Sequence, residues 1–171
     1  MNTVSLPAWL SRYIYQELGG YYRPDFSWAS ENADNTHADN IRYAGTYMVR
    51  TYAEVQRITQ QIDDRTLFFK INQPSVVRVM SVGCGTGGDI TGLVQALSTI
   101  YPNAEFRLVL ADANIDAIGI CREMLNRARC DGELRVEIEA IEQIKNCKKI
   151  TSEKFSSSGV SCSSTHHGTH F

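Results

Sequence analysis

Two stretches in the first 62 residues place apolar side chains at helical spacing. The first is 5–18, SLPAWLSRYIYQEL, where the pattern stops at the glycine pair Gly19–Gly20. The second, 38–62, repeats the pattern over a longer span and contains Gly45. The residues predicted to share its buried face are Ile41, Met48, Tyr52, Val55, Ile58 and Ile62. We therefore expect two N-terminal helices, separated by a polar and aromatic loop.

After Pro74 the pattern changes to short β-branched runs that alternate with amphipathic segments. Strands are predicted at 75–82, 105–112 and 133–141. Helices are predicted between them, at 89–101 and 114–129. Strand, helix, strand, helix, strand is the order typical of a parallel sheet with right-handed crossovers. The predicted fold class is therefore α/β, with an incomplete parallel sheet of about three strands preceded by N-terminal helices.

Composition narrows the classes of protein to consider. A net charge of −2, 43% hydrophobic and 21% charged residues indicate a globular chain without a strong global attraction for nucleic acid. No apolar run approaches the ~20 residues of a membrane span, and the N-terminus lacks the pattern of a secretory signal. The five cysteines contain no CxxC pair and predict free thiols. We expect a cytoplasmic protein.

The loop between the first predicted strand and helix, SVGCGTGGD at 81–89, is the main candidate for chemistry. Glycines there let the backbone turn tightly and approach a ligand, and the next helix directs free N–H groups at the same place. Gly83, Gly85 and Gly87 therefore predict a cofactor at the carboxyl end of the first strand. Asp112 ends the second strand, where an acid can accept hydrogen bonds from ribose hydroxyls.

Two cofactor classes fit the glycines. Gly83, Gly85 and Gly88 satisfy the dinucleotide pattern GxGxxG, whereas Gly83, Gly85 and Gly87 satisfy GxGxG. The segment VMSVGCGTGGD resembles the first motif of class I S-adenosylmethionine-dependent methyltransferases, and the segment LVLADAN is similar to their second strand with its ribose-binding acid. The resemblance covers roughly 41–144 and is strongest over 76–114. It implies a Rossmann-like fold that binds S-adenosylmethionine.

The resemblance also assigns individual residues. It implies that the glycine loop lies near the amino-acid part of the cofactor, and that Asp112 binds the ribose. Cys84, inside the loop, is predicted to be a small buried thiol, because a nucleophile would need a paired His or Lys nearby. Ser81 departs from the pattern, because many members carry an acid there. A hydroxyl can form hydrogen bonds, but it cannot pair by charge with the cofactor's ammonium group.

Other candidates each have a structural alternative. RYAGTY resembles the capping segment of several methyltransferases, so Arg42 and Tyr47 are candidate cofactor contacts; a surface arginine and a core-edge tyrosine are the alternative. Glu139 or Glu142 could contact adenine, or be solvated strand-end glutamates. Asp89 is predicted to cap the helix. The sequence HHGTH at 166–170 lacks a folded frame for further ligands, so no metal site is predicted.

The sequence predicts three regions: a helical cap at 1–74, a Rossmann-like cofactor-binding region at 75–150, and a disordered serine- and histidine-rich tail at 151–171. In the family, TSEKF commonly precedes a fourth strand, but here a serine-rich run follows. Serine and cysteine codons often begin with T, and a one-base shift turns them into codons for apolar residues. The expectation is a truncated or frameshifted chain, catalytically inactive by itself.

The function predicted from the sequence is that of an S-adenosylmethionine-dependent methyltransferase or a truncated fragment of one. The methyl acceptor stays open: a small molecule or a protein, with nucleic acid not excluded. Two alternatives also stay open. The first is a non-catalytic module that binds cofactor or serves as a partner subunit. The second is a fragment of an NAD-dependent oxidoreductase.

Overall fold

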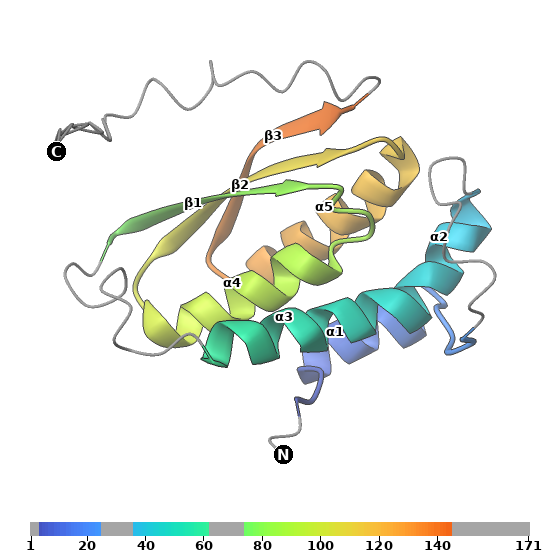
Figure 1. The fold of residues 1–171 in the computed structure, drawn as a ribbon, viewed down its shortest axis with the longest axis horizontal. Coiled ribbons are helices and arrows are strands. Elements are labelled where there is room, and N and C mark those ends of the chain that lie inside the picture. Colours follow the sequence, from blue (N-terminus) through green and yellow to red (C-terminus); the bar gives the residue numbers. More distant parts are fainter. Residues whose placement is uncertain (1–3, 25–35, 62–73, 145–171) are drawn as a thin grey trace, which may run out of the picture.

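A computed structural model describes residues 4–24, 36–61 and 74–144 of the chain (Figure 1). Both N-terminal helices predicted from the sequence are present, and each contains a π-helical turn. The first consists of α1 (Ala8–Arg12) and η1 (Tyr13–Glu17); the second consists of α2 (His37–Tyr43), η2 (Ala44–Met48) and α3 (Val49–Gln61). None of the helices in these ranges is long and apolar enough to cross a membrane.

The predicted fold class is confirmed: the chain is α/β, with a parallel sheet that follows the N-terminal helices. The strands β1 (Val76–Val82), β2 (Glu105–Asp112) and β3 (Val136–Gln143) lie in the order β1-β2-β3. The crossover helices are α4 (Gly88–Ile100) and α5 (Ile115–Cys130). The carboxyl ends of β1 and β2 therefore meet at one edge of the sheet, where the two strand-to-helix loops begin.

β3 begins three residues later than the sequence predicted. The amides of Glu133 and Leu134 both donate to the carbonyl of Ala128, near the end of α5. These residues therefore belong to the turn that closes the helix, so pairing with β2 starts only at Val136. The strand then continues to Gln143, with an irregularity opposite Leu108 and Val109.

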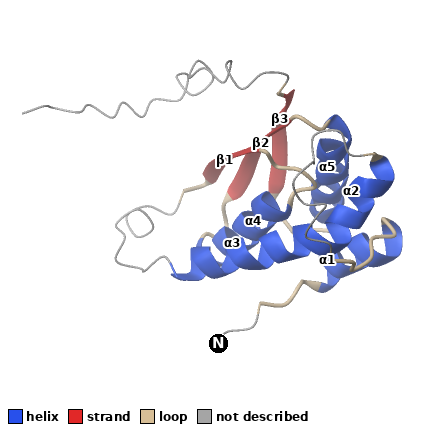
Figure 2. Ribbon diagram, turned by 45° about the vertical axis from the view of Figure 1, so that its right-hand side comes forward, coloured by secondary structure: helices blue, strands red, loops and turns tan. Residues whose placement is uncertain are grey.

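The helices lie together on one face of the sheet (Figure 2). The central strand β2 directs Phe106, Leu108 and Leu110 into this layer, and all three are fully buried. The opposite face carries charged side chains near the amino ends of the strands. Arg107 lies within 2.8–3.7 Å of glutamates on β2 and β3, namely Glu105, Glu137 and Glu139. Such ion pairs contribute little to stability individually, but they make this part of the face polar.

The long N-terminal helix packs on α4 through glycines. A Cβ atom at Gly92 would lie 2.7 Å from the Tyr52 carbonyl oxygen, so only glycine permits this approach. The prediction that Ile58 is buried is wrong, because its side chain is 62% exposed. Thr59 is buried instead. It lies about three helical turns beyond Met48, on the same side of the helix, whereas the Ile58 side chain points about 100° away from that of Thr59. Ile62 lies outside the described residues.

Candidate functional site

The loop after β1 has the backbone that its glycines predicted. Gly83, Gly85 and Gly87 have φ angles of +77°, +50° and +95°, in the left-handed region that side chains other than glycine rarely adopt. A Cβ atom at Gly83 or Gly85 would have no neighbour within 4 Å. A Cβ at Gly87 would instead lie 2.6 Å from Cys121 Sγ. The first two glycines therefore face open space, and the third packs against α5.

A cavity of about 210 Å³ opens beside this loop, at the carboxyl ends of β1 and β2. Its walls come from α2, the glycine loop, the end of β2 and the start of α5. The residues that line it are Asn40, Tyr43, Gly83, Gly85, Asp112, Asn114 and Ala117. This is the place where open parallel sheets bind their ligands. Gly83, Gly85 and Asp112, all candidates from the sequence, are thereby brought together.

Asp112 links the two loops that border the cavity. Its Oδ2 accepts a hydrogen bond from the Gly85 amide at 2.7 Å, and its Oδ1 accepts one from the Asn114 amide at 2.8 Å. Each carboxylate oxygen has two lone pairs. The carboxylate therefore fixes the glycine loop and keeps acceptor capacity for a ligand in the cavity.

Ser81 and Asp89 form a second polar pair, behind the glycine loop. The buried Ser81 hydroxyl donates to Asp89 Oδ2. Burial raises the pKa of Asp89, as does the nearby charge of Asp112, while hydrogen bonds from Ser81 and the Ile90 amide act against the rise. The N-cap of α4 is Gly87, not Asp89. Asp89 therefore lies in the first turn of α4, two residues after the N-cap. There its carboxylate accepts hydrogen bonds from backbone N–H groups, as a capping side chain does.

The N-terminal helix contributes different residues to the cavity than the sequence predicted. Asn40 and Tyr43 line it, whereas Arg42 and Tyr47 are half-buried and are not among the lining residues. Tyr47 contacts the lining residue Tyr43, because the centroids of the two rings are 5.2 Å apart. Burial is the main cause that raises the pKa of Tyr43, followed by the charges of Asp112 and Asp89. Tyr43 and Asp112 both line the cavity.

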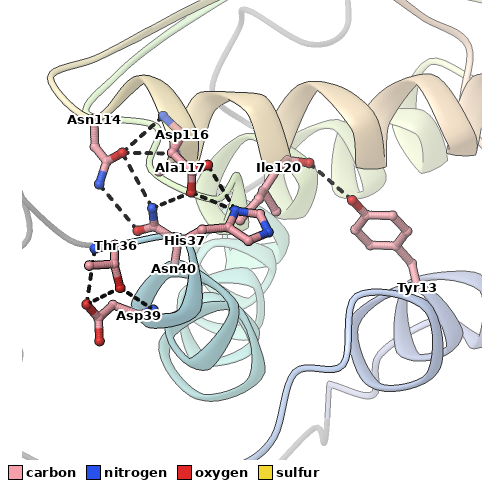
Figure 3. A network of polar contacts seen from close by, with 9 residues as sticks. All are labelled: Tyr13, Thr36, His37, Asp39, Asn40, Asn114, Asp116, Ala117 and Ile120. Carbon is pink, nitrogen blue, oxygen red and sulfur yellow. Dashed lines mark hydrogen bonds and ion pairs between the residues drawn. The ribbon is translucent and has the colours of Figure 1, made fainter.

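A polar network holds α2 against the start of α5 (Figure 3). Asn114 caps α5, because its Oδ1 accepts from the amides of Asp116 and Ala117, both at 3.1 Å. The buried amides of Asn40 and Asn114 exchange hydrogen bonds of 3.4 Å, and Asn40 also donates to Asp116 at 2.8 Å. His37 Nδ1 lies 2.9 Å from the same aspartate. These contacts place Asn40 and Tyr43 over the cavity.

Sequence reasoning did not find Asn40, Tyr43, Asn114 or Ala117. One signal was present, because Asn40, Tyr43 and Tyr47 recur at the spacing of one helical face. Arg42 lies between them and projects from another side of the helix. No signal pointed to the pairing of Asn40 with Asn114, which are 74 residues apart in the sequence.

The remaining candidates lie away from the cavity lining. Cys84 is buried, as predicted. Hydrogen bonding with Cys84 and burial raise the pKa of Cys121. The Cys121 thiol is therefore a poor nucleophile. Glu139 contacts Arg78 and Arg107 on the outer face of the sheet, each at 3.5 Å. Glu142 is half-buried. Neither glutamate lines the cavity.

No group of three or more potential metal ligands occurs within residues 4–24, 36–61 and 74–144. The HHGTH sequence lies outside these ranges, as does the predicted tail. Comparison with known proteins gives no further assignment, because no protein-family model and no curated protein matches the chain.

Proposed function

We propose that this chain binds S-adenosylmethionine in the cavity beside the glycine loop, as the cofactor-binding part of a class I methyltransferase-type domain. The loop sequence GCGTG, the acid at the end of β2 and the two preceding N-terminal helices support this proposal. The cavity lies where the loop and the acid meet, with Gly83, Gly85 and Asp112 in its lining.

One observation favours this cofactor over a dinucleotide: carboxylates already occupy N–H groups that a pyrophosphate would need. Asp112 accepts from the Gly85 amide at 2.7 Å. Asp89 lies in the first turn of α4 and accepts from the Ile90 amide. In dinucleotide-binding domains the pyrophosphate takes the corresponding loop and helix donors. Here two negative charges would repel it.

The same charges suit S-adenosylmethionine, which has a sulfonium and an ammonium cation, and a ribose whose hydroxyls can donate to a carboxylate. Asp112 is the only charged residue that lines the cavity within the described residues. An anionic wall therefore attracts the cationic part of this cofactor. We assign Asp112 to the ribose and the loop to the amino-acid part.

Isothermal titration calorimetry with S-adenosylmethionine and with NAD⁺ tests the proposal directly. We expect saturable 1:1 binding of S-adenosylmethionine and its demethylated product, S-adenosylhomocysteine, and no detectable heat with NAD⁺. Binding of NAD⁺ in preference to S-adenosylmethionine would instead support an oxidoreductase fragment and would refute the proposal.

Substitution of Asp112 locates the bound ligand. We expect Asp112→Ala to weaken binding of S-adenosylmethionine and S-adenosylhomocysteine by a similar factor, about 1–3 kcal/mol in free energy, because both share the ribose. Calorimetry on both ligands measures the effect. Glu137→Ala, on the outer face of the sheet, is the matched carboxylate control and should leave both affinities unchanged. A loss confined to the methylated ligand would show that Asp112 does not bind the ribose.

A further inference from the structure

Helix α2 holds Asn40 and Tyr43 over the cavity, yet it contributes little to the core. Asn40 is the only buried residue within the described range His37–Tyr43. Among the described residues, the buried apolar core contains no side chain of α2. Elements with little apolar burial open locally at a low cost in free energy. This part of the cavity wall can therefore open while the core stays packed.

The helical segments that follow α2 are, in contrast, fixed by close packing. A Cβ atom at Gly45 would lie 2.4 Å from the Tyr21 amide nitrogen, and one at Gly88 would lie 2.5 Å from the Met48 carbonyl oxygen. The side chains of Met48 and Tyr52 are fully buried. η2 and α3 are thus held against the N-terminal segment and α4, and they provide a fixed support for α2.

The hydrogen-bond pattern of the helix changes between these two parts. At Ala44 the α-helix passes into the π-helical turn η2, and the Ala44 amide donates to the carbonyls of both Asn40 and Ile41. A π-helical turn interrupts the regular ladder, and helices bend at such turns. At its other end α2 is closed by a capping box, in which Thr36 and Asp39 exchange hydrogen bonds. α2 can therefore move as one helical unit about its junction with η2.

Both carboxylate oxygens of Asp116, on α5, interact with α2 (Figure 3). Oδ2 accepts from Asn40 Nδ2 at 2.8 Å, and His37 Nδ1 lies 2.9 Å from Oδ1 and 3.0 Å from Oδ2. Asn114 already caps α5, because it accepts from the amides of Asp116 and Ala117. The Asp116 side chain is therefore directed across to α2 and not back to its own helix.

We propose that α2 is a lid over the cavity, hinged at its junction with η2, and that Asp116 is the latch that holds the lid closed. Opening breaks the hydrogen bonds to Asp116 and moves Asn40 and Tyr43 away from the cavity, while η2, α3 and the core stay in place. Asp116 is thereby a positioning residue that controls ligand entry and release. The lid does not depend on the identity of the ligand, whereas its effect on S-adenosylhomocysteine rests on the proposed function.

Hydrogen exchange of the chain without ligand tests the lid. The hydrogen-bonded amides of α2 should exchange faster than those of α3 and α4, because local opening exposes them. Asp116→Ala should speed exchange in α2 about 5- to 10-fold, as for the loss of hydrogen bonds to a partly exposed charge, and leave α3 and α4 unchanged. Glu123→Ala, which removes an exposed carboxylate from the same helix, is the control and should change none of them. Exchange in α2 as slow as in α4, or unchanged by Asp116→Ala, would overturn the lid.

Binding kinetics distinguish a latch from a ligand contact. The latch closes the lid in the free and in the bound chain alike. Asp116→Ala should therefore raise both the association and the dissociation rate constants of S-adenosylhomocysteine about 5- to 10-fold. The dissociation constant should change by less than about threefold. Surface plasmon resonance measures both rates. Faster dissociation with an unchanged association rate would show that Asp116 only supports the bound ligand, and would refute the latch.

His37 gives access to the latch from the α2 side. Its side chain is 61% exposed, so His37→Ala is expected to keep the fold even if Asp116→Ala does not. It should speed exchange in α2 less than Asp116→Ala, because Asn40 still bonds to Asp116. The double variant should be no faster than Asp116→Ala alone, since that change already removes the partner of His37. Additive acceleration would mean that the two residues act separately, and it would contradict the latch.

The two kinds of measurement separate this inference from the proposed function. If the folded chain does not bind S-adenosylhomocysteine but Asp116→Ala speeds exchange in α2 alone, the proposed cofactor is wrong and the lid stands. If the chain binds S-adenosylhomocysteine and Asp116→Ala changes neither exchange nor the rate constants, the lid is wrong and the cofactor stands.

Discussion

Gly87→Ala is expected to lower the free energy of unfolding by about 3 kcal/mol, the sum of two separate effects. The φ angle of +95° is strained for any residue with a side chain, at a cost of about 1–2 kcal/mol. The new methyl group would also lie 2.6 Å from Cys121 Sγ and 3.0 Å from Met124 Cε. Both side chains are fully buried, so neither can move away freely, and such overpacking costs about 1–3 kcal/mol.

Chemical denaturation of Gly87→Ala and wild type measures this loss, and Gly119→Ala is the matched control. Gly119 lies inside α5, has an ordinary φ angle, and would have no neighbour within 4 Å of a new Cβ. The control should therefore be more stable than wild type by about 0.5–1 kcal/mol, because alanine favours helices. If Gly87→Ala were as stable as wild type, the result would contradict the close packing of Gly87 against Cys121 and Met124 of α5.

Gly85→Val is expected to abolish binding of S-adenosylmethionine, with a loss of at least about 100-fold in affinity. At a φ angle of +50° a β-branched residue is a steric outlier. The space beside Gly85 has no protein atom within 4 Å of a new Cβ, and it borders the cavity. The valine side chain would therefore occupy the volume that the ligand needs. Titration of the folded variant measures the loss.

Gly132→Val separates backbone strain from the loss of binding. Gly132 also has a positive φ angle, +73°, and open space beside it. It lies in the turn between α5 and β3, at the end of the sheet away from the cavity. This control should lose stability as Gly85→Val does, yet bind the cofactor normally. Equal affinities of the Gly85 variant and wild type would mean that the ligand does not approach the loop there.

The sequence predicted the elements around the site because their signals are local. β2 was expected at 105–112 and is observed at Glu105–Asp112, since a β-branched and apolar run is bounded on both sides by turn residues. The glycine loop was equally clear, because left-handed backbone requires residues without a Cβ, and three of them recur at alternate positions. Asp112 followed from its place at the end of the second strand.

The N-terminal helix shows where local signals fail. Periodicity identified the helix, yet Ile58 is exposed and Gln56 and Thr59 are buried in its place. Buried polar residues are tolerated here because their side chains find partners nearby: Gln56 donates to the Tyr52 hydroxyl at 2.9 Å, and Thr59 donates to the Val55 carbonyl at 2.8 Å. The rotation of a helix depends on the surface against which it packs, and that surface is distant in sequence.

Local sequence is enough to predict the order of elements, the parallel α/β class, the left-handed glycine loop and the acid at the end of β2, because each depends on residues within one short segment. Tertiary packing, in contrast, sets which of the three glycines face the cavity and which one packs on Cys121. It also brings Asn40 and Asn114 together, and it joins the Ser81 hydroxyl to the Asp89 carboxylate. These contacts depend on how helices dock on the sheet, and docking depends on the shape of the whole core.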